Sequence, residues 1–345
     1  MIKKGKANCI IGGQWGSCGK GKLAGWLYPN YPEISIAVSD FTPNAGHTFV
    51  EDDGRSYVSK ILPMGLLFET VRTVIIGPHA VFSEDRLFEE LSVFTRTNPC
   101  ADVFIHPLAS VLTAKNVADE NRQLRHIAST MQGSAAAAVA KIMRDPNITN
   151  FAKNSRRLRC MVVDTHELMQ ERLGKGETAL IETGQGFDLG LNNGWEWPYV
   201  TGRDTMLGRT LDSAGVHPNQ LGSVIVALRT YPIRVGCISG GSSGGCHHDQ
   251  AELSWEAISK ELGYTVSEYT TVTKRLRRVF TWSDEQVVRM LRLIKPDYAF
   301  LNYVNYWPKE NVEELLALVR NLLSEHDCTL SLLGFGAKQG EMERE

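Results

Sequence analysis

The stretch Cys9-Ile-Ile-Gly-Gly-Gln-Trp-Gly-Ser-Cys-Gly-Lys-Gly-Lys-Leu23 joins a short apolar run to a loop with five glycines and two lysines. A strand that enters such a loop, followed by a helix start, places backbone N–H groups and the positive helix end against a polyphosphate. The standard phosphate-binding motif differs, because Gln14 and Gly21 stand where it has glycine and a Mg²⁺-binding Ser or Thr. The stretch therefore predicts a phosphate-binding loop after a buried strand. A tight strand-to-helix turn without a ligand is the alternative.

Short apolar runs recur along the chain, and stretches of helical period lie between several of them. We expect buried strands at residues 9–11, 34–38, 74–76, 161–163, 179–181, 224–228 and 298–301. We expect helices at residues 87–95, 128–143, 252–262 and 284–293. This alternation predicts an α/β fold with a P-loop-like, largely parallel central sheet flanked by helices, with smaller excursions. No change in composition marks a boundary, so residues 1–345 are expected to form a single domain.

The composition indicates a globular chain that binds small molecules. Its 345 residues are 43% hydrophobic, enough to bury a large core, and the formal net charge of -2 gives no basic surface for nucleic acid. No run of apolar residues is long enough to span a membrane. The 7 cysteines have no C-x-x-C spacing, which argues against a disulfide framework or a zinc ribbon. We therefore expect a cytoplasmic protein without a membrane or nucleic-acid partner.

A second polar segment, Asn44-Ala-Gly-His-Thr48, follows the expected strand at 34–38. A histidine on such a loop suits proton transfer or the stabilisation of a developing oxyanion. Together, Gln14-Trp-Gly-x-x-Gly-Lys-Gly-Lys22 and Asn44-Ala-Gly-His-Thr48 resemble the motifs of the adenylosuccinate synthetase family. Members of that family transfer the γ-phosphate of GTP to O6 of IMP, and the amino group of aspartate then displaces that phosphate.

Further segments extend the resemblance over most of the chain. Ser129-Thr130 is similar to the family's Thr-Thr pair at the nucleotide phosphate, and Arg144 falls where the family's arginine reaches a neighbouring subunit's substrate. Glu182-Thr-Gly-Gln-Gly186 and Pro198-Tyr-Val-Thr201 are similar to family segments at the substrate nucleotide. The resemblance implies a homodimer. It implies a substrate-nucleotide site formed by Ser17, Asn44, Ser129, Thr130, Arg144, Gln185 and Thr201.

The segment Glu268-Tyr-Thr-Thr-Val-Thr-Lys-Arg-Leu-Arg-Arg278 resembles the family's aspartate-binding loop. The implied aspartate-binding residues are Thr271, Thr273, Arg275 and Arg277, and guanidinium groups suit this task because they pair with carboxylates in bidentate fashion. Taken without the other motifs, residues 274–278 would be a solvated basic face.

The resemblance also implies a phosphate-donor site and Mg²⁺. Lys20 and the loop amides would hold the polyphosphate, His47 would stabilise the O6 anion, and Gln185 would orient the base. Ser17 completes this catalytic set, and the same residue and Gly46 are the implied Mg²⁺ contacts. The implied donor-binding residues are Gly16, Ser17, Cys18, Gly19, Lys20, Gly21, Gly46, His47, Thr48, Asn305 and Gly336.

Ser17 stands where the family has an aspartate that removes the N1 proton of IMP and binds Mg²⁺. Serine is shorter, so it leaves room beside N1 for the 2-amino group of guanine. It resembles the bacteriophage branch of the family, which joins aspartate to dGMP and forms 2-amino-2′-deoxy-N6-succinyl-adenylate. We expect this ligase reaction. The alternatives are a synthetase acting on IMP and an inactive nucleotide-binding paralogue. Asp40 could supply a substitute base through water.

A second departure lies at Leu301-Asn-Tyr-Val-Asn-Tyr306, where the family has Thr-Lys-Leu-Asp-Val. The family's aspartate accepts two protons from guanine, whereas Asn305 offers one acceptor and one donor, which suits an adenine edge. Tyr303 replaces the lysine that stacks on the base, and Gly334-Phe-Gly-Ala337 makes the pocket more apolar. We expect ATP or dATP as the phosphate donor. Core packing at this strand end is the alternative.

Three features lie outside these motifs. The run at residues 240–245 is typical of a mobile surface loop, or of a lid over a ligand. Cys246-His-His-Asp249 imitates a metal cluster, but adjacent ligands point in different directions. Trp195 and Trp197 either wall the substrate base or cap the sheet.

Overall fold

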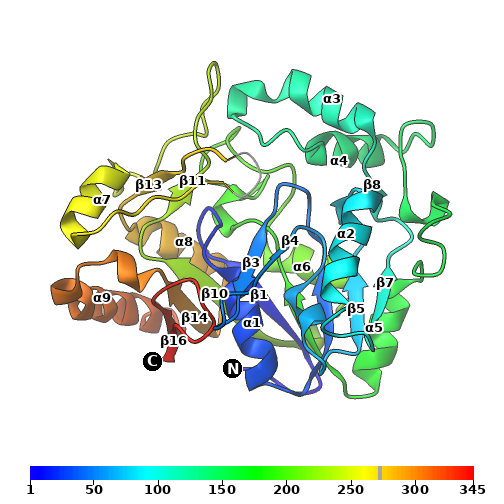
Figure 1. Ribbon diagram of the computed structural model, residues 1–345, viewed down its shortest axis with the longest axis horizontal. Helices are drawn as coiled ribbons and strands as arrows, with labels where there is room; N and C mark the ends of the chain where they lie inside the picture. Colours follow the sequence, from blue (N-terminus) through cyan, green and yellow to red (C-terminus); the bar gives the residue numbers. More distant parts are fainter. Residues whose placement is uncertain (271–273) are drawn as a thin grey trace.

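A largely parallel sheet of nine strands is the centre of the computed structural model, which describes residues 1–270 and 274–345 (Figure 1). Only the edge strand β16 runs antiparallel to its neighbour. From edge to edge the strands are β16 (Met342–Arg344), β15 (Thr329–Gly334), β14 (Tyr298–Asn302), β10 (Leu221–Arg229), β1 (Ala7–Gly12), β9 (Thr178–Glu182), β2 (Ile34–Ser39), β5 (Thr73–Ile76) and β7 (Asp102–Ile105). The α/β prediction is confirmed, whereas the single-domain organisation stays a prediction.

Helices cover both faces of this sheet, because successive side chains of a strand point to opposite faces and both sets are apolar. On β1, Ile10 belongs to a core cluster that includes side chains of α1 and α2, whereas Cys9 belongs to one with side chains of α5 and α6, and Ile11 to one with side chains of α8 and α9. In the described residues the helices are α1 (Lys20–Asn30), α2 (Glu84–Phe94), α3 (Ala114–Gln123), α4 (Ser134–Met143), α5 (Thr165–Gly174), α6 (Leu207–Ala214), α7 (Trp255–Leu262), α8 (Asp284–Ile294) and α9 (Val312–Ser324). None of these helices is long and apolar enough to cross a membrane.

Smaller units surround the main sheet. The hairpin of β3 (His47–Val50) and β4 (Ser56–Ser59) packs against α1, and β6 (Val81–Phe82) pairs with β8 (Ser110–Val111). A separate antiparallel sheet has the order β11 (Ile233–Arg234), β13 (Arg278–Phe280) and β12 (Glu252–Leu253). In Figure 1 this sheet and α7 lie on one side of the molecule, and α3 and α4 lie on the other.

Glu182 fixes the carboxyl end of β9. Its buried carboxylate accepts hydrogen bonds from the Tyr28 hydroxyl at 2.9 Å and from the backbone N–H groups of Met64 and Gly65 at 3.0 and 3.1 Å. Burial raises the pKa of this carboxyl to about 7. The strand end, and with it the loop that follows, is therefore attached to α1 and to the 3-10 turn Met64–Leu67.

Most of the predicted elements form at their expected places. The prediction of a strand at residues 161–163 is wrong. Of these residues only Val162 takes part in a β-bridge, an isolated one to Ile105. The helix expected at 128–143 begins only at Ser134, after Gly133 with a φ of 83°. Similarly, residues 252–253 belong to β12 rather than to α7. In each case the neighbouring strand or turn overrides the apolar period of the local sequence.

The main sheet brings the predicted site motifs to one edge. Strands β9, β1, β10 and β14 are consecutive and parallel, so their carboxyl ends point the same way. Ligands of open α/β sheets bind in the crevice outside these strand ends. The phosphate-binding loop and the loop that carries Gln185 leave from two adjacent strands of this group.

Candidate active site

The loop after β1 has the geometry of a phosphate-binding loop. Gly19 caps α1 with a φ of 86°, a conformation that favours glycine, and Lys20 is the first residue of the helix. The Lys20 ammonium donates to the Gln185 carbonyl at 2.5 Å. Gly21 lies so close to β3 that a Cβ atom there would stand 2.6 Å from the Thr48 carbonyl oxygen. The missing side chain at Gly21 therefore lets the His47 segment approach the loop.

Two cavities meet at this loop. The smaller, about 270 Å³, is lined by Gly16, Cys18, Gly19, Lys20, Gly21, His47 and Thr48, all predicted donor-site residues. The larger, about 420 Å³, is lined by Ser129, Thr130 and Thr201, all predicted substrate-site residues. Both cavities are lined by Trp15, Ser17, Asn44, Gly46, Gln185 and Arg277. The predicted donor and substrate sites thus adjoin, and the predicted catalytic Ser17 and Gln185 stand at the junction.

Four buried polar atoms of the cavity walls have no hydrogen-bond partner among the described residues. They are the Trp15 indole nitrogen, the His47 Nδ1, the Ser134 hydroxyl and the Gln185 Nε2. Buried polar groups in native proteins are nearly always paired, so unpaired ones indicate a missing ligand or water. Trp15 and Gln185 line both cavities, His47 lines the smaller one and Ser134 the larger one.

His47 is held as a neutral imidazole. Burial, and then the charge of Lys20, keep its pKa well below 6.5. Its ring packs edge-on against Phe41, with the ring centroids 4.2 Å apart. A neutral ring can donate one hydrogen bond from either nitrogen without adding charge, so His47 can polarise an oxygen at neutral pH.

Ser17 is held by two arginines. Its backbone has a φ of 50°, and its carbonyl accepts from Arg229 at 2.8 Å, while its hydroxyl accepts from Arg277. The Arg229 side chain is fully buried, pairs with Glu268 at 2.5 Å and lies 4.1 Å over the Tyr303 ring. These contacts tie the phosphate-binding loop to the predicted aspartate segment.

The predicted substrate residues lie together, with one exception. Asn44 approaches Thr201 at 3.5 Å, and the Ser129 hydroxyl donates to Glu120 at 2.8 Å. Arg144 instead lies exposed at the end of α4 and lines neither cavity. Its role toward a partner subunit stays a prediction.

Of the residues predicted to bind aspartate, Arg277 lines both cavities and Arg275 lines neither. Arg275 instead donates to the Ala128 carbonyl at 3.1 Å, which connects the aspartate segment to the Ser129 segment. Thr271 and Thr273 lie outside the described residues.

Asn305 and Gly336 do not line the two cavities. Asn305 lies in a 3-10 turn after β14, and its side-chain oxygen is buried without a partner in the described chain. The Gly336 carbonyl accepts from Lys22 at 2.8 Å. Tyr303 lines the smaller cavity, but Arg229 covers one face of its ring. Recognition of an adenine base by these residues stays a prediction.

The prediction that Asp40 could supply a substitute base is wrong. Although its burial favours the neutral acid, ion pairs with Arg203 at 2.6 Å and with Arg209 hold its pKa well below the usual range. It also lines neither cavity. Its carboxylate is committed to two arginines and cannot readily take a proton.

The His-His-Asp stretch is not a metal cluster. Among the described residues, no group of three or more His, Cys, Asp or Glu side chains could hold a metal ion. His247 is buried, and its Nε2 lies 2.5 Å from the Asp188 carboxylate. Trp195 stacks on His247, with the ring centroids 4.2 Å apart, whereas Trp197 lines the larger cavity and is 74% exposed.

Sequence reasoning assigned no role to Trp15, Arg229, Arg234 or Tyr199. Trp15 lines both cavities, Arg234 and Tyr199 line the larger one, and Arg229 holds Ser17. Arg229 has a usable signal in the sequence, since it is a charged residue directly after the apolar run expected as a strand at 224–228. The places of Trp15, Arg234 and Tyr199 at the cavities depend on contacts between distant segments.

Comparison with known proteins decides the family. The family model described as adenylosuccinate synthetase matches residues 9–147 and 122–296. The chain belongs to the adenylosuccinate synthetase family. The predicted resemblance is thereby confirmed, as is a ligase of adenylosuccinate synthetase type.

Relatives from bacteriophages resemble this family member over nearly its whole length. The N6-succino-2-amino-2′-deoxyadenylate synthase of Vibrio phage phiVC8 is 35% identical, over 97% of this chain and 96% of the relative. A structure of the succinoaminodeoxyadenylate synthetase of cyanophage S-2L, bound to dGMP and dATP as an energy donor, has a TM-score of 0.88 and 31% identity, and the match covers 100% of this chain and 96% of that one. The adenylosuccinate synthetase of Methanocaldococcus jannaschii is 29% identical, over 87% and 83% of the two chains.

The state of His47 gives a pH prediction. Because its pKa lies well below 6.5, the imidazole is neutral from pH 6.5 upward and becomes charged only at lower pH. Because the pH dependence of kcat/KM reports groups of the free enzyme, we expect kcat/KM to show no acid limb from this residue between pH 6.5 and 8, and His47→Gln to lower kcat/KM about 100-fold. Steady-state kinetics across this range measure both effects. An acid limb above pH 6.5 that disappears in His47→Gln would contradict the neutral imidazole.

Proposed function

We propose that this chain joins L-aspartate to dGMP, using ATP or dATP, and forms 2-amino-2′-deoxy-N6-succinyl-adenylate. The observation that carries the proposal is Ser17 at the junction of the two cavities, where the family has an aspartate. The bacteriophage relatives named for this product, and the related structure with dGMP and dATP, support it. IMP as the substrate is the second candidate, supported by the similarity to the Methanocaldococcus jannaschii enzyme.

The reaction would proceed in two steps. In the first, O6 of dGMP attacks the γ-phosphorus of the donor, the bond to the β-phosphate oxygen breaks, and N1 loses its proton to water. In the second, the aspartate amine attacks C6 and loses a proton to water, the C6–O6 bond breaks, and inorganic phosphate leaves with O6. Such a reaction needs positioning and charge stabilisation more than covalent catalysis.

The smaller cavity suits the triphosphate. Lys20 and the N-terminus of α1 supply positive charge there, and the loop glycines let the backbone approach the ligand closely. The neutral His47 would donate a hydrogen bond to O6 or to the transferring phosphoryl oxygens. The Gln185 Nε2, which has no partner among the described residues, would donate to the base at the junction.

Arg277 suits the aspartate carboxylate. It lines both cavities, and in the free protein it donates to the Ser17 hydroxyl and lies 4.0 Å from Glu268. A hydroxyl and a distant carboxylate are weaker partners than a bidentate carboxylate. An incoming aspartate can therefore displace them.

The junction also suits a Mg²⁺ ion carried by the donor triphosphate. Mg²⁺ usually keeps several waters and takes most other ligands from phosphates, so it needs only one or two oxygen atoms of the protein. The Ser17 hydroxyl and the Gly46 carbonyl are the oxygens that we propose. When bound, the ion would neutralise charge on the β- and γ-phosphates.

A substrate survey tests the reaction. We expect aspartate-dependent phosphate release to be fastest with dGMP and an adenine nucleotide. The panel pairs dGMP, GMP, dIMP and IMP with ATP, dATP and GTP, each with and without aspartate. Release with IMP but not with dGMP would overturn the proposal. The absence of aspartate-dependent release with every pair would support an inactive nucleotide-binding protein.

Ser17→Asp tests the substrate choice. Aspartate tolerates the positive φ at this position, so the loop can keep its shape, while the longer carboxylate fills the space beside N1. We expect the ratio of kcat/KM for IMP to that for dGMP to rise about tenfold or more. Ser17→Ala is the matched control, because it removes the hydroxyl and keeps the space. An equal rise in both variants would mean that the hydroxyl, and not the space, selects the substrate.

We further propose a homodimer in which Arg144 completes the partner's site. The α4 residues Val139, Ile142 and Met143 are 58%, 72% and 65% exposed, an apolar surface next to Arg144 that a second copy would bury. Dimers usually pair the same surface on both subunits.

A mixing experiment tests the shared site. Lys20→Ala and Arg144→Ala should each be nearly inactive, because each removes one charge from every site. Mixed and re-equilibrated, they form heterodimers with one intact site, and about a quarter of the wild-type activity should return by random pairing. Arg156→Ala, another exposed arginine, should remain active. Full activity of Arg144→Ala, or no recovery on mixing, would contradict the shared site.

A further inference from the structure

The glycine-rich run at residues 240–245 is part of the cavity wall. Ser243 in this segment is only 4% exposed and lines the larger cavity. Its neighbour Ser242 donates its N–H to the His126 carbonyl at 3.1 Å. Gly241 packs so tightly against the Arg125 carbonyl that a Cβ atom there would collide with it. The segment thus contacts the turn that precedes Ser129 and Thr130.

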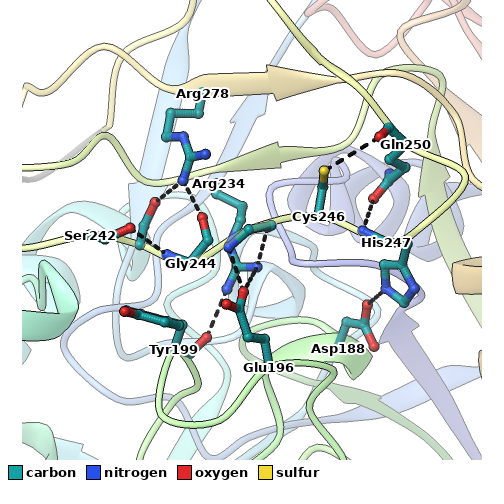
Figure 2. A network of polar contacts seen from close by, with 12 residues as sticks. Asp188, Glu196, Tyr199, Arg234, Ser242, Gly244, Cys246, His247, Gln250 and Arg278 are labelled. Carbon is teal, nitrogen blue, oxygen red and sulfur yellow. Dashed lines mark hydrogen bonds and ion pairs between the residues drawn. The ribbon is translucent and has the colours of Figure 1, made fainter.

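Two arginines hold this segment from neighbouring strands (Figure 2). Arg234 on β11 stands directly opposite Arg278 on β13, and like charges at such positions destabilise a sheet unless acceptors surround them. Arg234 donates to the Gly245 carbonyl at 2.8 Å, and Arg278 donates to the Gly244 carbonyl and, at 3.0 Å, to the Ser243 hydroxyl. We use the name arginine clamp for Arg234 and Arg278 together with Ser243, Gly244 and Gly245, the three residues that the arginines bind.

Two carboxylates pair with the arginines of the clamp. Glu252 accepts from Arg278 at 2.7 and 2.6 Å, in bidentate fashion. Glu196 accepts from the Gly245 N–H and lies 3.9 Å from Arg234. The pair of like charges is therefore compensated on both sides.

The clamp also contacts the wall of the larger cavity through Arg234. Arg234 donates to the Tyr199 carbonyl at 2.8 Å and lies 4.7 Å over the Trp15 ring, and both of these residues line the larger cavity. Arg278 follows Arg277 in the chain. Figure 2 also shows His247, beyond the clamp, against Asp188, which stands three residues after Gln185.

We propose that Arg278 is a positioning residue that sets the wall of the substrate-nucleotide cavity through the glycine-rich segment. The inference rests on the proposed function for the identity of the nucleotide. Arg278 lines neither of the two cavities described above and acts through Ser243 and Gly244. Its loss should therefore weaken binding of the substrate nucleotide more than binding of the phosphate donor.

The test measures binding and turnover with Arg278→Ala, Arg278→Lys and Gly244→Ala. A Cβ atom at Gly244, where φ is 91°, would stand 2.7 Å from the Cβ of Tyr199. We expect Arg278→Ala and Gly244→Ala to raise the dGMP KM and dissociation constant about tenfold, with the ATP KM within about twofold and Arg278→Lys intermediate. Calorimetric titration with dGMP and with IMP gives the dissociation constants without turnover.

Gly245→Ala is the matched control. Its new methyl would have its nearest neighbour, the Glu196 carboxylate, at 3.4 Å, so the segment keeps its place. Unchanged dGMP and IMP binding in the folded Arg278→Ala and Gly244→Ala proteins would overturn the positioning role. Equal losses of dGMP affinity in Gly244→Ala and Gly245→Ala would also overturn it. If binding of IMP rather than dGMP is weakened in these variants, the positioning role of Arg278 is supported and dGMP is rejected as the substrate.

Discussion

The parallel pairing of β1 with β9 determines how close the two main site loops come. The phosphate-binding loop follows β1, the Gln185 loop follows β9, and both leave the sheet at the same edge. The Lys20 ammonium then bridges the loops through the Gln185 carbonyl at 2.5 Å. Because a backbone carbonyl has no net charge, this contact does not form an ion pair that would compete with an incoming phosphate. The junction of the two cavities, and the roles proposed for Ser17 and His47, depend on this arrangement.

Arginine side chains connect the loops that surround the two cavities. Arg229 and Arg277 tie Ser17 to the aspartate segment, and Arg275 ties that segment to Ser129. Arg234 and Arg278 hold the glycine-rich segment against the same cavity. Guanidinium groups suit this work because each presents several donors in a fixed plane and can satisfy carbonyls from different loops. Loops without regular secondary structure thereby become a defined wall.

Several parts of this arrangement could be predicted from local sequence. Buried strands give continuous apolar runs, and the glycine-rich loop with its lysines indicates phosphate binding by its composition alone. The errors occur where distant segments intervene. Residues 161–163 have the composition of a strand but find only one bridge, and Asp40 has the chemistry of a base but lies between two arginines. The glycine-rich run has the composition of a mobile loop, yet two strand arginines hold it in place.

The central sheet, the phosphate-binding loop, the family and the place of Ser17 in its motif could all be predicted from the order of the amino acids. These features depend on residues that are neighbours along the chain, so their periods and spacings can be recognised locally. Which charges are available for chemistry depends instead on the tertiary structure. Arg203 and Arg209, which neutralise Asp40, lie 163 and 169 residues away from it along the chain. A contact over that distance forms only when the whole sheet has folded, because no local pattern encodes which buried charge will find which partner.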